Sequence, residues 1–245
     1  MTKWVWKGLR SGVKTTQYPK KAETAPGISP GRPSVGSFYD PKIARILTEL
    51  CPTNAICDHG SHLIVKQERC IHCMRCADGN SRGIEWENSY EWAQFVDKED
   101  RLPSSFSRSL HIRILDAGAC GACMSEIRQI TNPYYNIHKL GFFITPTPRT
   151  ADILLVAGPI TEHMLQPLIR AYEAMPGPKR LIALGTCALS GGIFGKTFAV
   201  MGGIEQVAPV HIKIPGCPPP PLAILHGLVL AARKLAPISK KKGGL

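Results

Sequence analysis

The chain has 245 residues and a formal net charge of +12; 44% of its residues are hydrophobic and 20% are charged. This composition excludes a disordered chain and predicts a packed core, in one large domain or in a small and a medium one. No apolar run reaches the ~18 residues that span a bilayer, so we expect a soluble or peripheral protein. The nine cysteines are odd in number and no secretory signal is visible, which favours reduced, metal-binding thiols in the cytosol over a disulfide scaffold.

The amino-terminal segment 1–37 is basic and rich in Pro, Gly, Ser and Lys, and we expect an extended arm that wraps a surface. Its first part, TKWVWKGLRSGV, has the pattern of a short amphipathic helix, weakened by two glycines. Residues 1–21 hold six Lys or Arg and no acid, which suits anionic lipid or an acidic partner. We do not expect nucleic-acid binding, because no zinc-finger, RRM or helix-turn-helix pattern accompanies the charge.

The rest of the chain divides into two expected domains. Residues 38–100 hold the first cysteine group, the polar segment 101–109 is a linker, and a domain at 110–237 precedes a basic tail at 238–245. In the larger domain short β-rich runs alternate with helical stretches, which predicts a parallel sheet with helices on both faces. The expected strands are 111–118, 141–148, 152–159, 180–185 and 209–216, and the expected helices are 123–131, 161–175 and 220–235.

Cys70, Cys73 and Cys76 are spaced as in a ferredoxin, but no Cys-Pro follows them; Cys-Pro occurs upstream instead, at Cys51. In two-cluster bacterial ferredoxins the motif is C-x2-C-x2-C-x3-C-P, and its fourth cysteine binds the other cluster. If one motif has lost its three-cysteine run and the other its Cys-Pro, one complete set of four remains. We therefore predict one [4Fe–4S] cluster on Cys51, Cys70, Cys73 and Cys76.

Two alternatives stay open for this group. A zinc site is less favoured, because zinc ligands usually come as two separated pairs. Cys57 is left over from the predicted set, and we expect it to be a small, buried apolar residue.

A second cysteine group lies in the larger domain, where Cys120, Cys123, Cys187 and Cys217 each follow a predicted strand. The carboxyl ends of parallel strands lie on the same side of a sheet, so these distant thiols converge. Nearby glycines allow a close approach of backbone to a bulky group. We predict a second [4Fe–4S] cluster here; structural zinc is the alternative, and no nucleotide-binding motif follows a strand.

The amino-terminal part resembles the ferredoxin-like subunit of respiratory complex I and of related hydrogenases. The stretches TTQYP, SPGRPS and CPTNAI carry the resemblance, which covers roughly residues 8–85 and lacks one of that family's two clusters. The resemblance implies a small ferredoxin-like domain whose basic arm lies on the membrane-facing side.

Residues 111–235 resemble the 20 kDa iron–sulfur subunit of complex I and the small subunit of group 4 membrane-bound [NiFe] hydrogenases. The matching stretches are TPRTADILLVAGPIT, YEAMPGPKRLIALGTCALSGGIF and VAPVHIKIPGCPPPP. The Cys120–Cys123 spacing follows the hydrogenases, and Glu126 matches an acid in both families. Met124 departs from the acidic or small polar residue of the hydrogenase-like members. The expected fold class is an α/β flavodoxin-like open parallel sheet, preceded by the small ferredoxin-like domain and its basic arm.

The resemblance implies an electron-transfer subunit of an oxidoreductase whose active site is on another chain. The expected partners are a catalytic large subunit like that of [NiFe] hydrogenases or the complex I 49 kDa subunit, a ferredoxin-type iron–sulfur subunit, and integral membrane subunits. We expect a peripheral location on the cytoplasmic side of the cell membrane. Glu126 is a candidate proton relay or a helix-terminal acid. The alternatives are the same role in a quinone- or ferredoxin-linked complex without nickel–iron, and a free-standing ferredoxin-type carrier.

Overall fold

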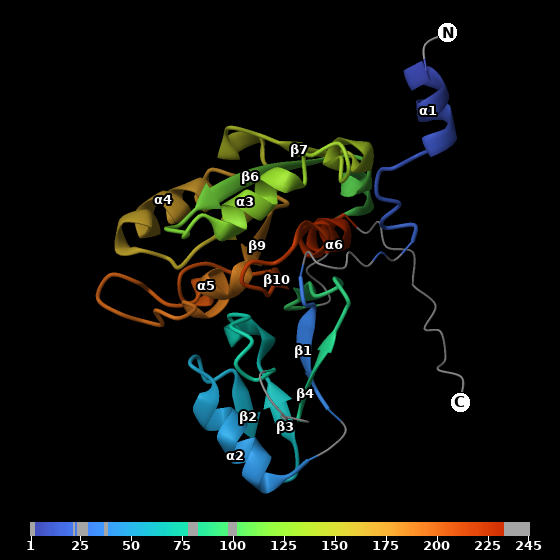
Figure 1. The fold of residues 1–245 in the computed structure, drawn as a ribbon. Coiled ribbons are helices and arrows are strands. Elements are labelled where there is room, and N and C mark those ends of the chain that lie inside the picture. Colours follow the sequence, from blue (N-terminus) through green and yellow to red (C-terminus); the bar gives the residue numbers. More distant parts are fainter. Residues whose placement is uncertain are drawn as a thin grey trace.

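A six-stranded sheet forms the centre of the computed structural model, which describes residues 3–21, 23, 29–36, 39–77, 83–97 and 102–232. The strands lie in the order β5-β10-β9-β8-β6-β7. Figure 1 labels β6, β7, β9 and β10 of this sheet. Their bounds are Gln94–Phe95 for β5, Leu110–Asp116 for β6, Phe142–Ile144 for β7, Ile153–Ala157 for β8, Arg180–Leu184 for β9 and Ile212–Ile214 for β10.

The five strands β6 to β10 pair in parallel, and their order, counted along the chain, is 2-1-3-4-5. This is the strand order of the flavodoxin-like fold, so the expected fold class is confirmed. Each of the five predicted strands is present; most are shorter than predicted, and β6 begins one residue earlier, at Leu110. The short strand β5 was not predicted; it pairs antiparallel with β10.

Helices cover both faces of the sheet. Alternate residues of β8 point to opposite faces, and all five are buried, as expected for a central parallel strand. Helices α3 (Ala122–Gln129) and α6 (Pro221–Ala231) pack on one face, and α4 (Glu162–Glu173) and α5 (Gly185–Ser190) on the other. The predicted helices correspond to α3, α4 and α6, but α5 was not predicted. Residues 233–235 of the last predicted helix, and the expected tail at 238–245, lie outside the described residues.

The cysteine-bearing amino-terminal part is a small unit with its own core (Figure 1). Helix α2 (Pro41–Leu50) begins after Asp40, whose carboxylate accepts hydrogen bonds from the backbone N–H groups of Lys42 and Ile43. Pro41 suits the first turn, where no intrahelical N–H bond is lost. The strands of this unit pair antiparallel, β1 (Arg32–Val35) with β4 (Ile84–Glu87) and β2 (Ile56–Asp58) with β3 (Leu63–Val65).

Short 3-10 helices connect many of these elements. One of them, η2, falls within the expected linker at 101–109, of which residue 101 is outside the described part. Those in the part of the chain that the structure describes are η1 (Gln67–Arg69), η2 (Ser104–Ser107), η3 (Ile137–Leu140), η4 (Pro148–Thr150) and η5 (Ile204–Gln206).

Segments from the amino-terminal part also enter the core of the sheet domain. Tyr18 and Trp92 are buried in the same cluster as α3 and α6. The Thr16 backbone N–H donates to the Tyr134 carbonyl at 2.9 Å, and the Ala93 N–H donates to His226 Nδ1 at 3.1 Å. The two parts of the chain are therefore joined by packing and by hydrogen bonds.

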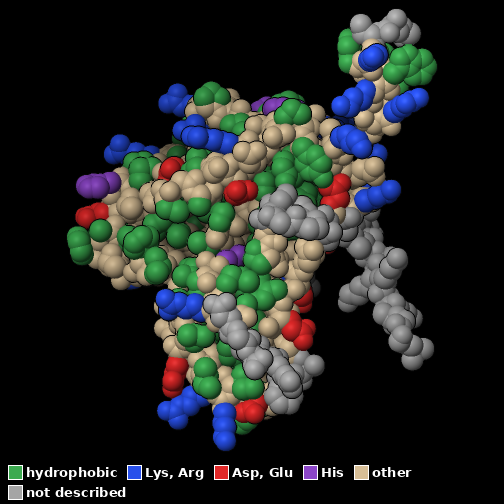
Figure 2. All heavy atoms as spheres, viewed as in Figure 1, with side chains coloured by type: hydrophobic (Ala, Val, Ile, Leu, Met, Phe, Trp, Pro, Cys, Tyr) green, Lys and Arg blue, Asp and Glu red, His purple; other side chains and the backbone are tan. Residues whose placement is uncertain are grey.

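Helix α1 (Lys3–Ser11) lies where the amphipathic pattern predicts a helix, and it projects away from the body (Figure 1). None of its residues is buried, and its surface shows both basic and large hydrophobic side chains (Figure 2). Trp4, Leu9 and the nearby Val13 are each at least two-thirds exposed. Within the described residues, no helix is both long and apolar enough to cross a bilayer.

The buried ring of His226 leads to a prediction about pH. Burial lowers the pKa of His226 to about 4, whereas an unfolded chain binds that proton near pH ~6.5. Between these two pH values the unfolded chain binds more protons at this residue than the folded chain does. The contribution of His226 to the free energy of unfolding is therefore full above pH ~6.5 and falls by about 3 kcal/mol as the pH drops to ~4.

We expect His226→Asn to remove this part of the pH dependence, because its amide oxygen still accepts from the Ala93 N–H but does not titrate. Unfolding midpoints measured anaerobically at several pH values test this. His163→Gln, on the exposed side of α4, is the control and should keep the wild-type pH profile. A His226→Asn profile parallel to wild type would contradict the prediction.

Candidate functional site

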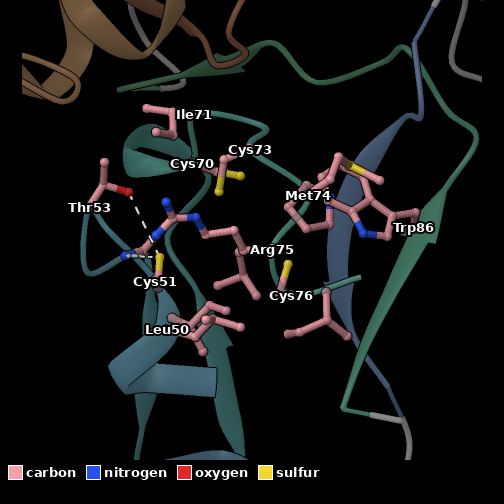
Figure 3. A pocket seen from close by; sticks show the side chains of 15 residues that line it. Leu50, Cys51, Thr53, Cys70, Ile71, Cys73, Met74, Arg75, Cys76 and Trp86 are labelled. Carbon is pink, nitrogen blue, oxygen red and sulfur yellow. Dashed lines mark hydrogen bonds between the residues drawn. The ribbon is translucent and has the colours of Figure 1, made fainter. Parts of the chain in front are cut away.

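The four cysteines of the first predicted set line one cavity (Figure 3). Cys51 comes from the end of α2, and Cys70, Cys73 and Cys76 come from the loop that follows η1. Apolar side chains line much of the remaining wall, among them Leu50, Ile56, Val65, Ile84 and Trp86. Cys57 is not among the lining residues; it lies on β2 and is half-buried.

Backbone N–H groups near Cys51, in the first set, are placed to stabilise a negatively charged sulfur. The Ala55 N–H donates to Cys51 Sγ at 3.2 Å. Burial alone raises the pKa of the Cys51 thiol, but backbone N–H groups of Thr53, Ala55 and Ile56 outweigh it, so its pKa lies below the usual value. These donors stabilise the thiolate, the form that binds metal.

The loop that carries the other three thiols is strained at two positions. His72 and Met74, which alternate with the cysteines, have φ angles of 51° and 62°. A left-handed conformation costs a residue with a side chain about 1–2 kcal/mol, and such costs concentrate at binding sites. Burial, then the neighbouring Cys76, Cys51 and Cys73, raises the pKa of Cys70 to about 12. The four thiols are therefore close enough to one another for their charges to interact.

The second predicted set also comes together in space, at the carboxyl ends of the parallel strands. Cys120 and Cys123 follow β6 at the start of α3, Cys187 lies in α5 after β9, and Cys217 follows β10. Burial, then the charges of Cys187, Cys217 and Cys120, raises the pKa of Cys123 to about 12. Burial, then the charges of Cys217 and Cys120, raises the pKa of Cys187 to about 11.

Two glycines make room for the thiols of the second set. A Cβ on Gly185 would lie 2.8 Å from Cys123 Sγ, and a Cβ on Gly192 would lie 2.7 Å from Cys187 Sγ. Both positions have positive φ, at +83° and +61°, which also favours glycine. The backbone at the second set therefore leaves room for thiols that bind a bulky group.

The donors at both places are thiols, the ligands of iron–sulfur clusters and of structural zinc. Among the described residues, no three His, Cys, Asp or Glu side chains are arranged to hold a single metal ion.

Glu126 lies beside Cys217 of the second set. It lines a cavity together with Cys217, Pro218, His72 and Met74, so this cavity lies between the second set and the loop that carries the first. Partial burial raises the pKa of Glu126. Met124, which departs from the hydrogenase pattern, packs against the buried cluster between the sheet and α6.

Two contacts between the cysteine groups were missed from the sequence. Helix α5, which carries Cys187, packs on η1: Thr186 Oγ1 donates to the Cys70 carbonyl at 2.7 Å, and Ser190 Oγ donates to the Glu68 carbonyl at 2.9 Å. The His72 ring lies against Trp86 and Trp92, with 5.6 Å between centroids in each case. The sequence indicates the Thr186 contact only weakly, through a hydroxyl residue next to Cys187 in an otherwise apolar stretch.

The fold and the cysteine placement define a flavodoxin-like domain with thiols gathered at the carboxyl ends of its strands. The profile of the family "NADH ubiquinone oxidoreductase, 20 Kd subunit" matches residues 120–231. The chain belongs to this family, which includes the small subunits of [NiFe] hydrogenases, so the resemblance of residues 111–235 is confirmed. The matched range does not reach residues 8–85, and the resemblance of that part stays a prediction.

Relatives at the level of sequence include a membrane-bound hydrogenase subunit and a formate hydrogenlyase subunit. The chain is 37% identical over 153 residues to the probable membrane-bound hydrogenase subunit mbhJ of Pyrococcus furiosus. The aligned region covers 62% of this chain and 92% of that subunit. It is 40% identical over 130 residues to formate hydrogenlyase subunit 7 of Escherichia coli, covering 53% of this chain and 51% of that subunit. Among solved structures, a chain of the membrane-bound sulfane sulfur reductase, an archaeal respiratory membrane complex, is similar with a TM-score of 0.47 and 29% identity, over 53% of this chain and 71% of that one.

Proposed function

We propose that this chain is an electron-transfer subunit of a hydrogenase-like or complex I-like oxidoreductase, and that it carries two [4Fe–4S] clusters. Cys51, Cys70, Cys73 and Cys76 hold the first, and Cys120, Cys123, Cys187 and Cys217 hold the second. The observation that supports this most directly is the gathering of two separate sets of four thiols in a chain of this family. Each cluster takes up and releases one electron at a time.

The chain's own residues bind the clusters and set their surroundings. The Ala55 N–H supports the Cys51 thiolate, and apolar side chains such as Ile84 and Trp86 limit the access of water to the first site. N–H donors to sulfur and burial are the main means by which a protein adjusts cluster potential. Glu126, with its raised pKa, is a candidate to hold a proton beside the second site.

The catalytic centre is proposed to lie on a partner chain. We infer a large subunit of the [NiFe]-hydrogenase or complex I 49 kDa type next to the second site, a ferredoxin-type subunit as electron partner of the first, and integral membrane subunits. Exposed Ile193, Phe194 and Phe198, in the loop after α5, form an apolar surface that suits burial against a large chain. A quinone- or ferredoxin-linked complex without nickel–iron remains the alternative partner, and a free-standing carrier is not favoured by the family.

Iron analysis of this chain, separated anaerobically from its partner subunits, tests the proposal. We expect about eight iron atoms and about eight acid-labile sulfides per copy of this chain, because each set of four thiolates holds one four-iron cluster. The visible absorption should bleach with dithionite. Zinc in place of iron, or about four irons per chain, would contradict the assignment of two clusters.

Helix α1 is proposed to attach the complex to the cytoplasmic surface of an anionic membrane. Lys3, Lys7 and Arg10 recur at helical spacing and face water, and Trp4 and Leu9 are exposed beside them. Basic residues near an anionic surface each contribute about 1 kcal/mol, and exposed Trp and Leu add apolar burial.

The double variant Lys3→Gln, Lys7→Gln should therefore bind phosphatidylserine-containing vesicles about 30-fold more weakly, from a loss of about 2 kcal/mol. Co-sedimentation at low and high salt measures this. The matched control Lys42→Gln, Arg45→Gln removes two exposed charges from α2 and should bind as wild type does. Equal binding by both variants would mean that α1 does not contact lipid.

A further inference from the structure

One hydroxyl group touches the loops of both cysteine sets. Thr186 directly precedes Cys187, and its Oγ1 lies 2.7 Å from the Cys70 carbonyl and 3.2 Å from the carbonyl of Gly216, which precedes Cys217. The Thr186 backbone N–H donates to the same Gly216 carbonyl at 2.9 Å. Residues next to Cys187 and Cys217 are thus linked to Cys70 itself, 116 positions away along the chain.

This contact is built into a closed interface. Thr186 is 1% exposed, so its hydroxyl has little access to water as an alternative partner. A buried hydroxyl is held by its hydrogen bonds, and a buried carbonyl that loses its donor is destabilised. The Thr186 hydroxyl therefore ties the backbone of Cys70 to the helix that carries Cys187.

The surrounding contacts hold the same two segments together at separate points. Ser190, one turn further along α5, donates to the Glu68 carbonyl of η1 at 2.9 Å. Lys213 on β10 pairs with Glu68 at 3.0 Å and with Glu205 at 2.7 Å. His72 from the first loop shares a cavity with Cys217 from the second. Of these polar links, the Thr186 bond is the one that ends on a cysteine of the first set.

We propose that Thr186 is a positioning residue that fixes the separation and coupling of the two cluster sites, through its hydrogen bond to the Cys70 carbonyl. This inference rests on the proposed function. The step that it serves is a one-electron exchange: the site at Cys70 loses one electron and the site at Cys187 gains one, or the reverse. No bond is made or broken and no proton moves.

The test compares variants that differ in the hydroxyl. Thr186→Val keeps the shape of the side chain and removes the donor, and Thr186→Ser keeps the donor. Ser190→Ala is the matched control, because it removes a similar bond from the same helix to a residue that is not a cysteine. Thr186→Val and Ser190→Ala should each lower the melting temperature by about 2–4 °C, the effect of one lost hydrogen bond in a chain of this size.

The deciding measurement is the EPR spectrum of the fully reduced complex, in which two nearby paramagnetic clusters split or broaden each other's signal. We expect this splitting to be lost or reduced in Thr186→Val, and kept in Thr186→Ser and Ser190→Ala, with the full iron content in all three. A wild-type spectrum in Thr186→Val, or an equal loss in Ser190→Ala, would overturn the proposal.

Two further outcomes are distinguishable from these. If Thr186→Val fails to retain iron, Thr186→Ala is compared with Thr186→Ser, because these two variants differ in the hydroxyl alone. Equal loss of iron in both variants would overturn the role of the hydroxyl. Retention of iron in Thr186→Ser alone would support it. Wild-type protein without two clusters would refute the proposed function itself, before any variant is compared.

Discussion

Replacing Cys51 by serine should remove the first cluster as completely as replacing Cys73. The iron content should fall from about eight to about four per chain, because a four-iron cluster needs its four thiolates. The structure brings Cys51 to the same cavity as the three closely spaced cysteines, and backbone donors there stabilise its thiolate. Serine has a far less acidic group than cysteine, so the N–H donors have no comparable anion to stabilise.

Cys57→Ser is the control for this experiment. Cys57 is six residues further along, half-buried, and absent from the lining of the cavity. This variant should keep all its iron and an unchanged EPR signal. The assignment would be reversed by an intact signal in the Cys51 variant together with its loss in the Cys57 variant.

Replacing Gly192 by alanine should remove the second cluster, with a fall in iron from about eight to about four per chain. The new Cβ would lie 2.7 Å from Cys187 Sγ and 3.3 Å from Cys187 Cα. A thiolate that binds iron has no freedom to move aside, so the contact is relieved only by displacing the ligand or the loop. The strained φ of +61° adds about 1 kcal/mol or more.

Gly195 provides a closely matched control in the same loop. Its φ is +60°, but a Cβ there would meet nothing within 4 Å. Gly195→Ala should therefore lose stability by about 1 kcal/mol through backbone strain alone and keep both clusters. Iron analysis and thermal unfolding of the two variants separate these effects. Equal iron contents in the two variants would show that the space beside Cys187 is not required.

The sequence predicts much of the sheet domain because its signals are local. Each parallel strand is a short apolar run that ends at Gly, Pro or a polar residue, so β6, β8 and β9 are found with small errors at their ends. Helix α5 escapes detection because it has only six residues and begins at a glycine. Strand β5, with two residues, carries no alternating pattern at all.

The candidate site likewise has features that the local sequence predicts and features that depend on tertiary structure. The spacings of Cys70, Cys73 and Cys76 are local, and Cys51 joins them through knowledge of a crossed ligation pattern. The bond from Thr186 to Cys70 depends on how η1 meets α5, which is a matter of tertiary packing between distant segments. Likewise, the room beside Cys187 depends on the φ of Gly192, and a glycine in a sequence does not reveal its backbone angle.

The pairing of β5 with β10 has a consequence for how this protein avoids aggregation. Phe95 and Gln94 cover the outer backbone groups of Ile212 and Lys213, so the apolar strand β10 is not left as an open edge. Uncovered edge strands recruit strands from other molecules. The segment that precedes the sheet domain thus protects the edge of the sheet by pairing with β10. A chain shortened to begin at residue 110 would leave β10 as an unpaired edge strand, which would be prone to aggregation until a partner chain covered it.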